Sequence, residues 1–212
     1  MASPLPRGRR IVILCEGDTE ELAVNYFVRR QWRDEGLQGV GLKPVNLYGK
    51  LEEAGRFAAD YLDDGEVLSV FALIDLLRMN RVKHQANDPL DAKVERVRSW
   101  LRSQVHHHRR AQDFFPHVSV HEVEAWILAE GTALSQRLQD PSIRPDPQAE
   151  WKNFQKPPKK RIGELFWRNK KTRYRETFDG QPLFSNMSFQ PVYDSCPYFR
   201  KFYDDLRAAG RP

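Results

Sequence analysis

Acidic side chains follow three apolar runs of this sequence, each at the point where a run ends. In chain order these acids are Glu16, Glu20, Asp75, Glu122 and Glu124. Carboxylates that are crowded together repel one another unless a cation is present. Hard divalent cations such as Mg²⁺ and Mn²⁺ prefer oxygen ligands. The acids therefore predict a site for Mg²⁺ or Mn²⁺, provided that the three runs are strands ending at one edge of a sheet.

The acids of the first two runs also have structural explanations. Asp18 and Glu20 could stabilise the first turn of a helix by their charge, and for Asp18 we favour that explanation. Glu16 stands beside a glycine, in a tight turn that would leave its side chain over the edge of the sheet. Asp75 ends the most apolar run of the chain, where a lone acid favours a functional role.

The segment around Glu122 and Glu124 is open to two interpretations. If a strand continues through it, the two carboxylates share a face. If a helix has already begun, they diverge by about 200°. His121 precedes them and could be a metal ligand, although a hydrogen-bonded, half-buried histidine is the more common case.

A basic segment at residues 156–175 complements the acids. It contains nine Lys or Arg residues and one acid, Glu164. Beside an acidic pocket, such a segment can hold a polyanion such as DNA or RNA. A solvated surface explains the charges alone equally well. Among these residues, Lys160 is the candidate for the lysine that lies nearest the acidic pocket and contacts a phosphate there. The expected phosphate contacts are Lys159, Lys160, Arg161, Lys170, Lys171 and Arg173.

Alternating strands and helices are expected to position these groups. Runs rich in β-branched residues predict strands at 10–17, 41–49, 66–75 and 117–121. Helical spacing of apolar residues predicts helices at 18–36, 51–65, 89–105 and from the last strand to about 131. Asp18 or Thr19 is the expected N-cap of the first helix. This alternation predicts an α/β fold with a central, mainly parallel sheet of about four strands and helices on both faces. Ligands of such sheets bind beyond the carboxyl ends of the strands, where the acids lie.

Three regions divide the chain by composition. Residues 1–9 are a basic tail, residues 10–131 carry the α/β pattern, and residues 132–212 form a basic, proline-rich extension packed on the same domain. Within the extension we expect a short helix at 160–167, a basic loop and a final helix at 196–208.

The overall composition excludes several classes of protein. Of the 212 residues, 40% are hydrophobic and 11% aromatic, which is enough for the core of one domain and argues against disorder. No apolar run reaches the roughly 20 residues needed to cross a bilayer, and no apolar segment resembles a signal peptide. The two cysteines, Cys15 and Cys196, fit a reducing cytoplasm better than secretion. Neither G-x-G-x-x-G nor G-x-x-x-x-G-K-[ST] occurs, which argues against a nucleotide-binding domain.

Four motifs, in order, resemble the Toprim-like domain of OLD-type nucleases: ILCEGDTEE, FALID, SVHEVEAW and CPYF. More closely, the chain is similar to small bacterial Toprim-like proteins that accompany AAA/ABC-type ATPases in phage-defence loci. The resemblance covers residue 10 to about 206. It implies a Toprim-like three-layer fold and a Mg²⁺- or Mn²⁺-dependent nuclease that acts as a defence effector with an ATPase. A homodimer or a hetero-oligomer, with no membrane contact, fits this resemblance.

The resemblance also implies roles for individual residues. Glu16, Glu20 and Asp75 would bind the catalytic metal, and Glu122, with or without Glu124, would complete the site. The sequence departs from the family where a second aspartate is expected, because that position holds Leu77. This loss weakens a second metal position. The alternative is therefore a catalytically degenerate regulatory or sensor subunit, which docks on an ATPase and binds nucleic acid or a phage component.

Restoring the missing acid tests these two interpretations. We expect Leu77→Asp to raise the affinity for Mn²⁺, measured by calorimetry, and to raise the rate of nucleic-acid cleavage, because the added carboxylate would help to hold a second cation. If the wild type is inert with every partner and Leu77→Asp changes neither quantity, the regulatory interpretation is correct.

Overall fold

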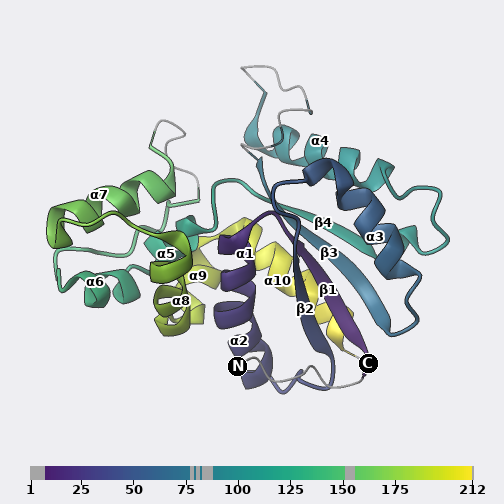
Figure 1. Cartoon of the computed structure of the whole chain (residues 1–212), viewed down its shortest axis with the longest axis horizontal. Coiled ribbons are helices and arrows are strands. Elements are labelled where there is room, and N and C mark those ends of the chain that lie inside the picture. The colour runs from purple at the N-terminus through teal and green to yellow at the C-terminus, as the bar shows by residue number, and fades with distance from the viewer. Residues whose placement is uncertain (1–7, 77–78, 80–81, 83–87, 151–155, 212) are drawn as a thin grey trace.

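Four parallel strands form the centre of the protein (Figure 1), in a computed structural model that describes residues 8–76, 79, 82, 88–150 and 156–211. They are β1 (Arg10–Cys15), β2 (Gly41–Asn46), β3 (Val67–Asp75) and β4 (Phe114–Ser119), in the order β2-β1-β3-β4. Every neighbouring pair is parallel, so the carboxyl ends of all four strands lie at one edge. The expected parallel sheet of four strands is confirmed.

Helices cover both faces of the sheet (Figure 1). Alternate residues of a strand point to opposite faces, so β1 contributes Ile11 and Ile13 to one core and Val12 and Leu14 to the other. The second core is covered by α3 (Ala54–Leu62) and α4 (Leu90–Ser103). The first is covered by helices from both ends of the chain. The expected three-layer α/β architecture is therefore confirmed.

The first helical segment differs in detail from the expected helix at 18–36. It consists of α1 (Asp18–Ala23), one π-helical turn (Val24–Val28) and α2 (Arg29–Asp34). The expectation that Asp18 or Thr19 is the N-cap is wrong, because Gly17 occupies that position. Its backbone N–H donates a hydrogen bond of 3.1 Å to a side-chain oxygen of Glu20. Glu20 thus satisfies a backbone donor that the start of the helix would otherwise leave unpaired.

The last strand begins and ends earlier than the sequence indicates. The sequence pattern predicts it at 117–121, but β4 spans Phe114–Ser119. Pro116 lies within it and is tolerated because β4 pairs only with β3 and forms an edge of the sheet. As a consequence Glu122 lies after the strand, and Glu124 is the first residue of α5 (Glu124–Glu130).

The C-terminal part contains more helix than the sequence predicts. Its elements are α6 (Thr132–Leu138), α7 (Pro158–Lys170), α8 (Glu176–Asn186), α9 (Phe189–Ser195) and α10 (Pro197–Gly210). The expectation of a basic loop between the helices predicted at 160–167 and 196–208 is wrong, because α8 and α9 lie there. Gly180 and Pro182 lower the intrinsic helix propensity of α8, whereas burial of Leu183 and Phe184 compensates.

Aromatic packing joins this part to the first core. Phe199 of α10 lies 4.6 Å from Trp126 of α5 and 5.5 Å from Phe27, measured between ring centroids. Leu183 and Phe184 of α8 belong to the same core. In the ranges that the structure describes, no helix combines the length and apolarity needed to span a bilayer.

Gly131 connects α5 to α6 and adopts a backbone conformation that residues with a side chain rarely adopt. Its φ is +68°, and a Cβ atom there would lie 2.7 Å from the backbone nitrogen of Pro145.

We expect Gly131→Ala to lower the free energy of unfolding by about 2 kcal/mol or more, measured by urea titration. Gly163→Ala in α7 is the control, because its Cβ would meet no atom within 4 Å. That variant should gain up to about 1 kcal/mol. Equal stability of Gly131→Ala and wild type would show that this turn tolerates a side chain.

Candidate active site

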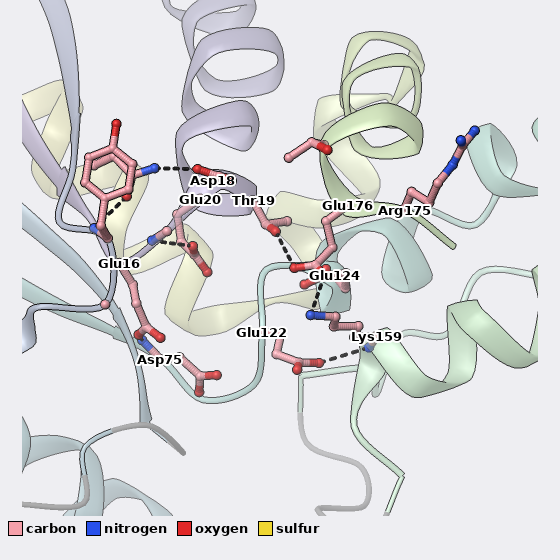
Figure 2. A pocket seen from close by; sticks show the side chains of 15 residues that line it. Glu16, Asp18, Thr19, Glu20, Asp75, Glu122, Glu124, Lys159, Arg175 and Glu176 are labelled. Carbon is pink, nitrogen blue, oxygen red and sulfur yellow. Dashed lines mark hydrogen bonds and ion pairs between the residues drawn. The ribbon is translucent and has the colours of Figure 1, made fainter. Parts of the chain in front are cut away.

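A pocket of about 610 Å³ lies at the carboxyl edge of the sheet (Figure 2). Its walls come from the turn after β1, the end of β2 and the turn after it, the end of β3, the start of α5 and the starts of α7 and α8. All five acids singled out from the sequence line it. The complete set of lining carboxylates is Glu16, Asp18, Glu20, Asp75, Glu122, Glu124 and Glu176. Their role as metal ligands stays a prediction.

Glu16, directly after β1, and Asp75, the last residue of β3, are neighbours in the acidic lining. Both are buried, with 4% of each residue exposed. The Oε2 atom of Glu16 accepts a hydrogen bond of 2.9 Å from the backbone N–H of Asp75, and the two side chains lie next to each other in Figure 2. The backbone carbonyl of Glu16 accepts another from Gly49, after β2. These contacts tie the ends of three strands together and orient Glu16.

The remaining acids of α1 have different surroundings. Glu20 is buried, and its hydrogen bond with Gly17 orients it. Asp18 is exposed and accepts a hydrogen bond of 2.7 Å from the side chain of Asn46 at the end of β2. This contact agrees with a structural role for Asp18.

A second group of acids lies around Lys159, near the start of α7 (Figure 2). The backbone N–H of Lys159 donates a 3.0 Å hydrogen bond to Glu122, and its ammonium nitrogen lies 2.5 Å from Oε1 of Glu176. Thr19 of α1 donates a 3.2 Å hydrogen bond to the other oxygen of Glu176. The C-terminal helices thus bring both a cation and a further acid to the pocket.

Glu124 is the most buried carboxylate among the described residues that line the pocket. Only 2% of the residue is exposed, and its Oε1 atom is buried without a hydrogen-bond partner. Burial raises the pKa of Glu124 well above its ordinary value, and the charges of Glu122 and Glu20 raise it further. A cation would satisfy both the orphaned oxygen and the excess negative charge. A donor set made of carboxylate oxygens suits Mg²⁺ or Mn²⁺.

The carboxylates are not gathered around a common point. Among the described residues, no group of three or more His, Cys, Asp or Glu side chains is arranged to hold a metal ion. Binding of a metal ion would therefore require these carboxylates to move closer together. Leu77, where the family pattern has an acid, lies outside the described residues.

The expected basic contacts divide between two cavities. Lys159 lines the acidic pocket, whereas Lys160 and Arg173 line a neighbouring cavity beside α7. Lys160 is the sequence-based candidate for a lysine near the scissile phosphate, and this role stays a prediction; in the structure Lys159, and not Lys160, lines the acidic pocket. Lys159 also belongs to the neighbouring cavity, so it lies where the two meet.

The other basic residues lie elsewhere. Arg161 forms an ion pair of 2.9 Å with Asp146. Lys170 and Lys171 are exposed at the end of α7 and line neither of the two cavities. Their expected contact with nucleic acid stays a prediction.

Sequence reasoning missed several pocket residues. Asn46 ends β2 and Tyr48 follows it, so the strand-end rule applied to this weaker strand would have found them. Arg175 ends the basic segment and Glu176 comes directly after it, and only the position of α8 brings them to the pocket. His121, considered as a ligand, is fully buried and does not line the pocket, and burial lowers its pKa.

The raised pKa of Glu124 predicts a pH dependence of stability. An acid whose pKa is higher in the folded state favours folding when protonated, so the free energy of unfolding falls as pH rises from about 4.3 through the folded pKa. If the folded-state pKa is higher than the unfolded-state pKa by 1, ionisation of the group lowers the free energy of unfolding by about 1.4 kcal/mol. In urea titrations with EDTA, Glu124→Gln should lose less stability than wild type between about pH 5 and pH 8.

The exposed Glu164 provides the control, because Glu164→Gln should follow the wild-type pH dependence. If Glu124→Gln loses as much stability as wild type over this range, the carboxyl of Glu124 is not the group responsible.

Comparisons with known proteins identify a family but no activity. Comparison with curated protein sequences gives no match. The C-terminal region of the Burkholderia pseudomallei OLD protein is similar in structure, with a TM-score of 0.47 and 16% identity, over 95% of this chain and 98% of that one. The C-terminal region of the Xanthomonas campestris pv. campestris OLD protein has a TM-score of 0.41 and 14% identity, over 94% and 98% of the two chains.

A family model described as "Domain of unknown function (DUF4276)" matches most of the sequence. Its match includes the turn after β1, the end of β3 and the helices that complete the pocket. Because it spans residues 15–207, the chain belongs to the DUF4276 family.

Proposed function

We propose that this protein is a Mg²⁺- or Mn²⁺-dependent nuclease that hydrolyses phosphodiester bonds of DNA or RNA. One observation carries the proposal: carboxylates from four separate segments share one pocket with Lys159 at the carboxyl edge of a parallel sheet. This edge is where α/β sheets of this type bind ligands. The Toprim-like motifs of the sequence support the same reaction.

The residues of the pocket have separate tasks in this proposal. Glu16, Glu20 and Asp75, with Glu122 and Glu124, would hold the cation. When bound, a divalent cation supplies positive charge to the phosphate oxygens and to an attacking water. Because Lys159 and the carboxylates of the strand ends come from different walls, a phosphate between them would be held in a fixed orientation.

Positive side chains of the pocket would meet the phosphate directly. Lys159 would exchange its ion pair with Glu176 for one with a phosphate oxygen, and Arg175 lines the same pocket. Glu16 is the residue best placed to accept a proton from water, because its hydrogen bond from the Asp75 N–H holds the carboxylate at the strand end.

The proposal predicts that single acids are essential for cleavage. Glu16→Gln keeps the shape of the side chain but removes its charge, and we expect it to lower the cleavage rate by roughly 100-fold or more. Cleavage of single-stranded and duplex oligonucleotides with Mg²⁺ or Mn²⁺, and its loss in EDTA, is the measurement.

Asp60→Asn is the matched control, since Asp60 is exposed on α3, away from the pocket. Its rate should equal that of wild type. Robust cleavage by Glu16→Gln would place the reaction elsewhere and refute the proposed site.

One observation favours a second function, that of a catalytically degenerate regulatory or sensor subunit. Among the described residues the acids are not arranged to hold a metal ion. In this alternative the chain docks on an ATPase and binds nucleic acid or a phage component. An ATPase partner and a role in phage defence belong to both proposals and are supported by the sequence motifs alone. Calorimetry with Mn²⁺ in the presence of a single-stranded oligonucleotide separates the two, because only the nuclease needs to bind Mn²⁺ in this pocket.

A further inference from the structure

A second cavity, of about 660 Å³, lies beside the acidic pocket along α7. Its volume falls within the roughly 300–1,000 Å³ of typical small-ligand sites. It is lined by Lys159, Lys160, Gly163, Glu164, Trp167 and the segment 172–174. None of the catalytic tasks proposed above uses its aromatic or basic side chains, apart from Lys159.

One face of α7 presents an aromatic surface to this cavity. Trp167 is 60% exposed, which is unusual for the largest apolar side chain. Lys160, Gly163 and Trp167 are spaced three and four residues apart and therefore share that face. At Gly163 a Cβ atom would meet nothing within 4 Å, so a flat group can approach the backbone of the helix.

The charges around Trp167 favour an anion. Lys160 and Arg173 are exposed and line the cavity, and Lys159 lies where it meets the acidic pocket. Glu164 is the acid of this lining, and it is paired with Lys156 at 3.6 Å. An anion placed beside Trp167 therefore meets a positive surface.

Tyr174 contributes a second aromatic ring to this cavity. Its ring packs on Phe166, with 5.3 Å between ring centroids, and lines the second cavity. Its hydroxyl is buried without a hydrogen-bond partner. Burial raises the pKa of this hydroxyl, and the nearby carboxylates of Glu124 and Glu176 raise it further.

We propose that the cavity beside α7 binds an unpaired nucleotide of a single-stranded nucleic acid, with its base stacked on Trp167 and its phosphates held by Lys160 and Arg173. This inference rests on the proposed nuclease function and names its substrate class. The adjoining phosphodiester would pass Lys159 into the acidic pocket. A duplex is disfavoured because its base faces are already stacked and cannot reach the indole, whereas stacking on exposed aromatic rings is a general mode of single-strand binding.

Binding without cleavage tests the inference. In EDTA, fluorescence anisotropy of a labelled oligothymidylate should show that Trp167→Ala weakens binding roughly 5- to 100-fold, the effect of losing one base–aromatic stack. Trp167→Phe should retain most of the affinity. Phe178→Ala is the matched control, because Phe178 is a similarly exposed aromatic, at 59%, and does not line the cavity. The duplex of the same oligonucleotide should bind more weakly and be indifferent to Trp167→Ala.

Two further readouts distinguish stacking from a general loss of structure. Binding of the oligonucleotide should quench tryptophan fluorescence of the wild type, and this quench should be lost in Trp167→Phe although that variant still binds. Lys160→Ala should lower the slope of log K against log salt concentration by about 0.7, the value for one phosphate contact on a single strand. Lys201→Ala, an exposed lysine of α10 that lines neither of these two cavities, should leave the slope unchanged.

The outcomes separate this inference from the nuclease proposal. If wild type fails to bind single strands in EDTA, or binds them as well after Trp167→Ala, the inference is overturned and the exposed indole is better explained as a protein-docking surface. That result leaves the Glu16-dependent cleavage test untouched. Conversely, Trp167-dependent binding by a protein that cleaves nothing supports the inference and refutes the nuclease.

Discussion

Mutual repulsion among carboxylates at one edge of the sheet is the constraint on which the site depends. Seven acids line a single pocket, and three of them, Glu16, Asp75 and Glu124, are almost fully buried. Ionised carboxylates in such surroundings repel one another, and their burial opposes folding. A fold that needed only stability would replace them with neutral side chains. Under the proposed function, a cation bound in the pocket accounts for their presence.

The fold limits this repulsion with groups from both ends of the chain. Backbone N–H groups at the strand end and the helix start orient Glu16 and Glu20, and these hydrogen bonds require no further charged side chain. The C-terminal helices add Lys159, whose backbone and ammonium groups partner two acids. The helices after residue 131 therefore complete the pocket, and the sheet alone supplies only its negative half.

Much of this arrangement is readable from the sequence because strands and acids follow local rules. Apolar runs predict all four strands, and Glu16 and Asp75 are found because the carboxyl ends of parallel strands share one edge. The start of β4 is missed because Pro116 is unfavourable in a strand unless that strand is at an edge, which is a tertiary fact. Helix α8 is missed because Gly180 and Pro182 oppose helix formation locally and packing overrides them. Glu176 is missed for the same reason, since its place in the pocket follows from the position of α8.

The same electrostatics couple the two ligands that the proposed reaction needs. Lys159 is paired with Glu176 in this structure, so a phosphate that takes Lys159 as partner leaves that acid without its cation. The additional negative charge then strengthens binding of a divalent cation, and a bound cation in turn favours the phosphate. Such coupling is reciprocal by thermodynamic necessity. Among the described residues, the acids are not arranged to hold a metal ion. This coupling provides a physical reason why they would form a metal site only when a nucleic-acid strand enters the pocket.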